Sequence, residues 1–179
     1  MGIKEPEKRP GIGMVVRKLL GLTSPKENGM LWVEGRIFDL QRLGTIVSTY
    51  HLAEGVKGTG AAPTLRRFGV SEVNRRLYEI EVRNFAGRHG LDQEELLAME
   101  PRKFFQIAAE TILSQSLVNS IRTSKSSPDK VAKTLNTILA EVEKRVNDPS
   151  LPSDLHVALL WFHRTGFDKA LLAAREPQG

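Results

Sequence analysis

The chain has 179 residues, with 26 Lys and Arg against 21 Asp and Glu, 40% hydrophobic residues and no Cys. That length and apolar content are enough for one domain with its own core, and they exclude a chain that is disordered throughout. The missing cysteine excludes a disulfide scaffold, a thiol nucleophile and any cysteine-ligated zinc or iron–sulfur site.

The sequence also lacks signals for membranes and export. No stretch approaches the ~20 apolar residues that cross a bilayer. The first ten residues include no apolar segment of the kind found in secretory signals. We therefore expect a cytoplasmic protein with no membrane partner.

The amino-terminal region divides into an arm and the start of a domain. Residues 1–13 contain prolines, glycines and charges with little apolar surface, which predicts a flexible basic arm. Residues 14–175 are expected to form a single helical domain, which begins with a short helix over 14–22. The segment Thr23–Gly29 contains Ser-Pro and Asn-Gly and is interpreted as a turn.

Residues 30–54 favour a helix, because apolar side chains recur every three or four positions and Gly55 supplies a stop. A hairpin around Glu34-Gly35 is the rival interpretation, since Thr45–Tyr50 is rich in β-branched residues. Residues 55–63 contain three glycines and predict a loop between the N-terminal part and a larger C-terminal helical part.

Residues 71–88 can be interpreted in two ways. Val73, Leu77, Ile80 and Asn84 share one helical stripe, after Ser71 as a cap, and such a stripe is expected to pack on a neighbouring helix. Tyr78–Arg83 also alternates like a strand. The fold class is therefore a mostly α multi-helix bundle, with minor β content in residues 30–85 left open.

The second half of the chain predicts helices more clearly. Asp92 is a cap for a short helix through Met99, and Pro101 begins a helix with a broad apolar stripe. Ser127-Pro128 begins another, which ends before Pro149. Further helices are expected from Ser153 to a stop at Gly166 and over 167–175.

Catalytic and metal-binding patterns are missing from this sequence. His156 and His163 are seven residues apart rather than three or four, and no Gly-x-Ser-x-Gly or phosphate-loop motif occurs. An enzyme would require residues among Asp154, His156, His163 or Asp168 to converge in a pocket. We expect a protein that is not an enzyme, with no cofactor and no metal site.

The positive charge is unevenly distributed, and the isoelectric point is about 9.6. Residues 56–90 contain seven basic and three acidic side chains. Lys and Arg that meet phosphates release counterions, so such a surface indicates salt-sensitive binding to a nucleic-acid backbone, with DNA and RNA not distinguished. The candidate contacts are Arg66, Arg67, Arg75, Arg76, Arg102, Lys103, Arg122 and Lys125.

The first functional hypothesis is therefore an accessory subunit of a nucleoprotein complex. The alternative is a helical adaptor or structural assembly subunit that binds proteins and no nucleic acid, with Trp161, Phe162 and Phe167 as its interface. The two hypotheses diverge on whether distant basic residues gather on one side of the fold or are dispersed and neutralised by neighbouring carboxylates.

Overall fold

The structure is a computed structural model that describes residues 23–56 and 70–177, and all regular structure in these ranges is helical. The expected multi-helix fold is confirmed, and the alternative of minor β content is wrong for the described parts of residues 30–85. The predicted arm 1–13, the helix 14–22 and most of the loop 55–63 lie outside the described residues. The elements are α2 (Pro25–Val56), α4 (Val70–His89), α5 (Gln93–Ala98), α6 (Pro101–Thr123), α7 (Pro128–Val146), α8 (Ser153–Trp161), the π-helical turn η1 (Phe162–Gly166) and α9 (Phe167–Arg175).

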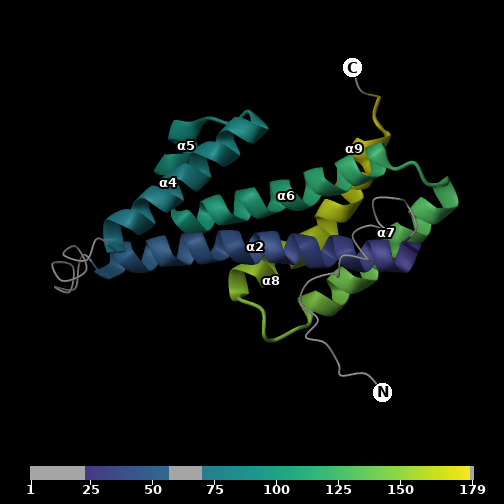
Figure 1. Ribbon diagram of the computed structural model, residues 1–179, viewed down its shortest axis with the longest axis horizontal. Helices are drawn as coiled ribbons and strands as arrows, with labels where there is room; N and C mark the ends of the chain where they lie inside the picture. The colour runs from purple at the N-terminus through teal and green to yellow at the C-terminus, as the bar shows by residue number, and fades with distance from the viewer. Residues whose placement is uncertain (1–22, 57–69, 178–179) are drawn as a thin grey trace.

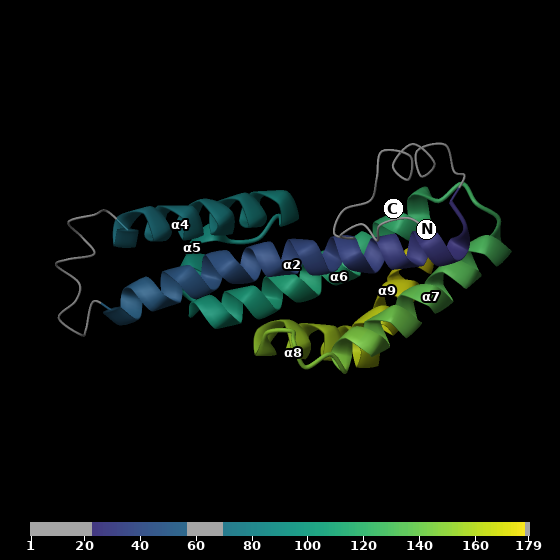
Figure 2. The same ribbon diagram turned by 60° about the horizontal axis from the view of Figure 1, so that its bottom comes forward.

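The 32-residue helix α2 is the central element of the fold (Figure 1). It contacts α4, α6, α7 and α8. Figures 1 and 2 show α4 alongside the C-terminal half of α2, α7 alongside its N-terminal half, and α6 along most of its length. No helix within the described residues is long and apolar enough to span a bilayer.

The predicted turn at Thr23–Gly29 is wrong, because α2 already begins at Pro25. The Ser24 hydroxyl accepts a hydrogen bond from the Glu27 backbone N–H at 3.1 Å, so Ser24-Pro25 forms a cap followed by proline in the first turn. Gly29 is buried, and a Cβ placed there would lie 2.6 Å from the Cβ of Thr137 on α7. This glycine permits close approach of two helices and does not mark a turn.

The predicted stop at Gly166 is also wrong. Gly166 has helical dihedral angles (φ −65°, ψ −35°), and the chain continues from α8 through η1 into α9. A Cβ at this position would overlap the Trp161 ring. Gly166 therefore makes room for an aromatic side chain one turn earlier in the same helical run.

The helix starts predicted from caps at Asp92 and Ser127 are confirmed, whereas the predicted cap at Ser71 is wrong, because α4 already begins at Val70. The Asp92 carboxylate accepts the backbone N–H of Glu94 at 2.9 Å and begins α5. The Ser127 hydroxyl accepts the backbone N–H of Lys130 at 3.3 Å and begins α7. After α4, Gly90 adopts φ +64°, which favours glycine.

Aromatic side chains connect the helices in the core. The Phe104 ring on α6 makes edge contacts with Tyr78 and Phe85 of α4, at centroid distances of 5.8 and 5.6 Å. At the other end, Phe162 stacks on Trp32 of α2 at 5.7 Å. The core is continuous along α2, with no break between the α4 end and the α7 end.

Candidate functional site

Helix α4 has apolar side chains on two opposite faces. The inner face consists of Tyr78, Val82, Phe85 and Ala86, all of which are buried against the rest of the molecule. The outer stripe consists of Val73, Leu77 and Ile80, whose exposed fractions are 55, 50 and 54%. The expectation that this stripe packs on a neighbouring helix is wrong within the described chain, because Tyr78 and its neighbours occupy that role.

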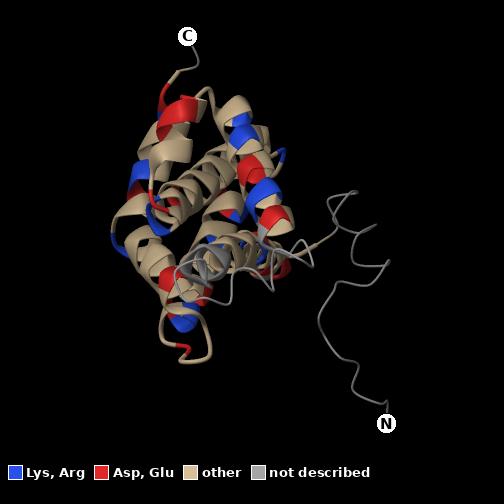
Figure 3. Cartoon of the chain, turned by 90° about the vertical axis from the view of Figure 1, so that its left-hand side faces the viewer, with Lys and Arg blue, Asp and Glu red and all other residues tan. Residues whose placement is uncertain are grey.

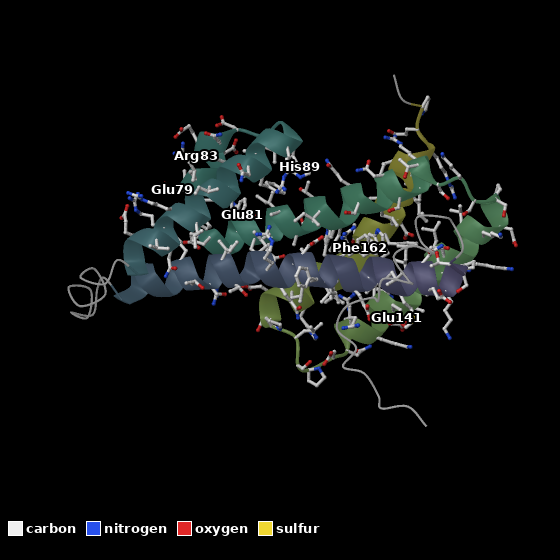
Figure 4. All side chains as sticks on the ribbon, in the orientation of Figure 1. Glu79, Glu81, Arg83, His89, Glu141 and Phe162 are labelled. Carbon is white, nitrogen blue, oxygen red and sulfur yellow. The ribbon has the colours of Figure 1, made fainter. Side chains whose placement is uncertain are left out.

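Two polar contacts add to the apolar packing of the inner face and orient α4. Arg42 of α2 donates to Glu81 at 2.8 Å, and His89 shares a hydrogen bond with Gln115 of α6 at 2.9 Å. Figure 4 labels Glu81 and His89, which extend from α4 toward α2 and α6, while Arg83 extends away from them. The fold therefore presents the outer stripe away from its own core.

The N-terminal turns of α4 contain a network of ion pairs. Arg75 pairs with Glu72 and with Glu79, the latter at 3.0 Å, and Arg76 pairs with Glu72 at 3.3 Å. Hydrogen bonds from Arg75, with Arg76 adding, lower the pKa of Glu72, and the contacts with Glu72 and then Glu79 raise the pKa of Arg75. These exposed pairs neutralise much of the charge that the sequence places here.

The last turns of α4 have unpaired charge instead. Arg83 and Arg88 are exposed and have no ion-pair partner within the described part of the chain. At helical spacing, Arg76 and Arg83 lie along one edge of the outer stripe, and Arg88 lies along the other edge. The outer stripe is thus an apolar strip with basic edges.

The predicted nucleic-acid contacts that the structure describes lie at two ends of the molecule and do not form one surface. Arg66 and Arg67 lie outside the described residues. The contact between Tyr78 and Phe104 places the start of α4 near the start of α6, which brings Arg75 and Arg76 to the end of the molecule that holds Arg102 and Lys103. Arg122 lies in the last turn of α6 and Lys125 lies just past that end, roughly 30 Å away at 1.5 Å per residue. Figure 3 shows blue and red segments interspersed in that view.

Arg122 has an internal role. Its guanidinium donates to the backbone carbonyls of Ala173 at 2.8 Å and Glu176 at 3.4 Å, where α9 ends. A cation at a helix C-terminus satisfies carbonyls that have no partner within the helix. Arg102, Lys103 and Lys125 are exposed and make no ion pair within the residues that the structure describes.

The predicted interface aromatics lie in or against the core. Phe162 is fully buried between Trp32 and Phe167, Phe167 is buried, and Trp161 is half-buried over Gly166. Their role as an interface stays a prediction, and their burial within the chain does not favour it.

The candidate catalytic residues are not gathered in one groove. Asp154 lines a groove with residues of α2 and with Phe105, and the other three candidates do not line that groove. His156 bonds the backbone carbonyl of Asp148 at 3.0 Å. Within the described residues no group of three or more His, Asp or Glu is placed to hold a metal ion.

Two further hollows lie beside α2. A groove of about 540 Å³ between the start of α2, the end of α6 and α7 has Trp32 and Leu117 in its wall and serine and threonine hydroxyls around them. A smaller polar hollow of about 290 Å³ surrounds the Arg42–Glu81 pair and His89. Arg42 pairs with Glu81 and His89 bonds Gln115 in this hollow, and Arg88 also lines it, without an ion pair in the described chain.

Comparison with known proteins adds no relative: no protein-family model, no curated protein and no solved structure matches this chain.

The sequence pattern identified the residues of the outer stripe but predicted that they are buried in the core. The signal that distinguishes the two outcomes is the second apolar set, Tyr78, Val82 and Phe85, on the opposite side of the same helix. A helix that is apolar on two sides needs a neighbour on both sides. Within the described chain, α4 has neighbours on its inner side only.

Proposed function

We propose that this chain is a non-enzymatic helical adaptor that binds another protein through the outer stripe of α4. The observation that supports this function is the exposure of Val73, Leu77 and Ile80, each at half or more, in one continuous row on a helix. Contiguous exposed apolar side chains on a folded surface mark interaction sites, because leaving them in water costs about 25 cal/mol per Å² that a partner could bury.

The surroundings of the stripe also support a docking role. On the side opposite the outer stripe, α4 is held in place by its buried inner face and by the Arg42–Glu81 and His89–Gln115 contacts. A preformed helix face loses little conformational entropy when it binds, which favours affinity. The adaptor hypothesis is therefore favoured over the nucleoprotein hypothesis, whose basic residues are dispersed or paired.

Site-specific photo-crosslinking tests the proposal. A photoreactive phenylalanine analogue is placed at Leu77 in the full chain, and at Val157 on α8 as a matched control with the same kind of exposure, 54%. We expect one partner protein to crosslink at position 77 and not at 157. The complex should re-form from the purified proteins and weaken at least about tenfold in Ile80→Gln. Equal crosslinking at both positions, or a complex insensitive to Ile80→Gln, would contradict the proposal.

Contact with a nucleic-acid backbone is the second candidate function, supported by exposed Arg102, Lys103 and Lys125 with no ion pair in the described chain. It is tested by binding of labelled duplex DNA and RNA at increasing salt. The nucleoprotein function predicts an affinity that falls about tenfold or more between low and moderate salt and falls again in the double variant Arg102→Ala, Lys103→Ala. The adaptor function predicts little or no binding at low salt.

A further inference from the structure

The outer stripe has the spacing of a helix-pairing seam. Val73, Leu77, Ile80 and Asn84 follow one another at steps of four, three and four residues, which is the alternation of core positions in a two-helix coiled coil. Gly87 continues the pattern, and a Cβ added there meets nothing within 4 Å, so the surface is open at this end. An elongated partner that follows α4 fits this pattern better than a compact knob, because the three exposed apolar side chains span about one heptad and Asn84 and Gly87 continue the same row for a second.

The basic edges of the stripe indicate the charge of that partner. Residues beside the core positions of a helix pair face the flanks of the partner helix and decide which partner is accepted. These flanking positions are Arg76 and Arg83 on one side and Glu81 and Arg88 on the other. Glu81 is already paired with Arg42, and Arg83 and Arg88 have no ion pair in the described chain, so the available flanking charge is positive.

A second copy of this chain fits the same surface poorly. In an antiparallel pair, Arg76 and Arg83 of one copy would face the same arginines of the other. In a parallel pair, Arg83 would face Arg88, and Arg76 would face Glu81, a carboxylate that Arg42 already engages. Like charges across a helix pair are destabilising, so the edges select against self-association.

We infer that the occupant of the outer stripe is an amphipathic helix of another protein, with an apolar heptad stripe edged by Glu and Asp. This inference rests on the proposed docking function and names the chemistry of the partner. The apolar stripe supplies affinity by burial of Val73, Leu77 and Ile80, and the arginine edges supply selectivity for an acidic helix. Asn84, at a core position, favours a partner register that places a polar side chain opposite it.

Two synthetic peptides test the inference with the full chain. Both are labelled three-heptad helices with leucine at the core positions, one with Glu at every flanking position and the other with Lys. Repulsion between like charges keeps each peptide from pairing with itself. Fluorescence anisotropy with the wild-type chain should give an affinity for the Glu peptide at least about tenfold higher than for the Lys peptide, and added salt should reduce the difference.

Two variants with matched controls locate the binding. Ile80→Gln should lower the affinity for the Glu peptide about tenfold or more, whereas Val157→Gln on α8 should leave that affinity unchanged. Arg83→Glu should lower the affinity for the Glu peptide and raise the affinity for the Lys peptide, several-fold in each case. Arg164→Glu on η1 should change neither affinity. Circular dichroism of each variant shows whether the fold is retained.

The other outcomes distinguish a failure of the acidic-helix inference from a failure of the proposed docking function. If both peptides bind equally and Ile80→Gln weakens both, the docking role of the outer stripe stands, and the inference that the partner helix is acidic is overturned. A concentration-dependent dimer that is lost in Ile80→Gln, or cosedimentation with anionic vesicles that is lost in the same variant, would replace the partner with a second copy or a lipid surface. Binding of neither peptide would overturn the inference, and the crosslinking at Leu77 would then decide whether the docking function stands.

Discussion

The side chain of Tyr78 shows how burial changes the acid–base behaviour of a single residue. The Tyr78 hydroxyl is buried and has no hydrogen-bond partner among the residues that the structure describes, and its ring stacks on Tyr50 at 4.3 Å. Burial, with Tyr50 nearby, raises the pKa of Tyr78 to about 12. The residue type alone indicates an apolar ring with a polar end, and only the packing shows that the hydroxyl is buried away from any partner in the described part of the chain.

Tyr78→Phe is therefore expected to keep or increase stability at neutral pH, by up to about 1–2 kcal/mol, because it removes a buried hydroxyl whose desolvation is not compensated. The sign of the pH dependence follows from the raised pKa. The unfolded tyrosine loses its proton near pH 10 and the folded one near 12, so wild-type stability falls as pH rises above 10. Urea unfolding at pH 7 and above pH 10 measures both effects. A variant that is less stable than wild type at pH 7 would mean that the hydroxyl is satisfied.

Whole helices show which local signals can be read from sequence. The caps at Asp92 and Ser127 involve side chains and backbone groups within three residues of each other, so they specify the starts of α5 and α7 without reference to the rest of the fold. Gly29 and Gly166 look like local breakers and are helical, because Thr137 and Trp161 occupy the space where a side chain would stand. Thr137 is more than a hundred residues from Gly29, so no local pattern contains this information.

Gly29→Ala and Gly35→Ala on α2 form a matched pair. At Gly29 the added methyl meets Thr137, so we expect overpacking to lower the free energy of unfolding by about 1–3 kcal/mol. At Gly35 a Cβ meets nothing within 4 Å, so alanine should stabilise the helix by about 0.5–1 kcal/mol. Thermal and urea unfolding of both variants measure the difference. Equal effects at the two sites would contradict the close contact between α2 and α7.

At the scale of the molecule, α2 connects the two ends of the fold. It contacts α4 at one end and α7 at the other, and its buried Leu40 lies between them. A core that is continuous along one helix is expected to unfold as a unit. The dispersal of the basic residues belongs to this scale too, because the length of α6 separates Arg102 from Arg122.

Leu40→Ala is expected to cost about 2–5 kcal/mol, because it leaves a cavity in the middle of the core. Phe38→Ala on the same helix is the control: Phe38 is 60% exposed, so its truncation should change stability by less than about 0.5 kcal/mol. Tryptophan fluorescence, from Trp32 and Trp161, and far-UV circular dichroism should follow one urea transition. Separate transitions by the two probes would show that the ends of the molecule unfold independently.

The sequence by itself determined that this protein is mostly helical, where α5, α6 and α7 begin, and one of the two apolar rows of α4. These properties depend on groups a few residues apart, whose geometry is the same in any helix. The tertiary structure decided which row of α4 is buried, why Gly29 and Gly166 have no side chain, and that the basic residues lie at opposite ends. Each of these depends on which distant helix lies alongside, and that is a property of the packed molecule.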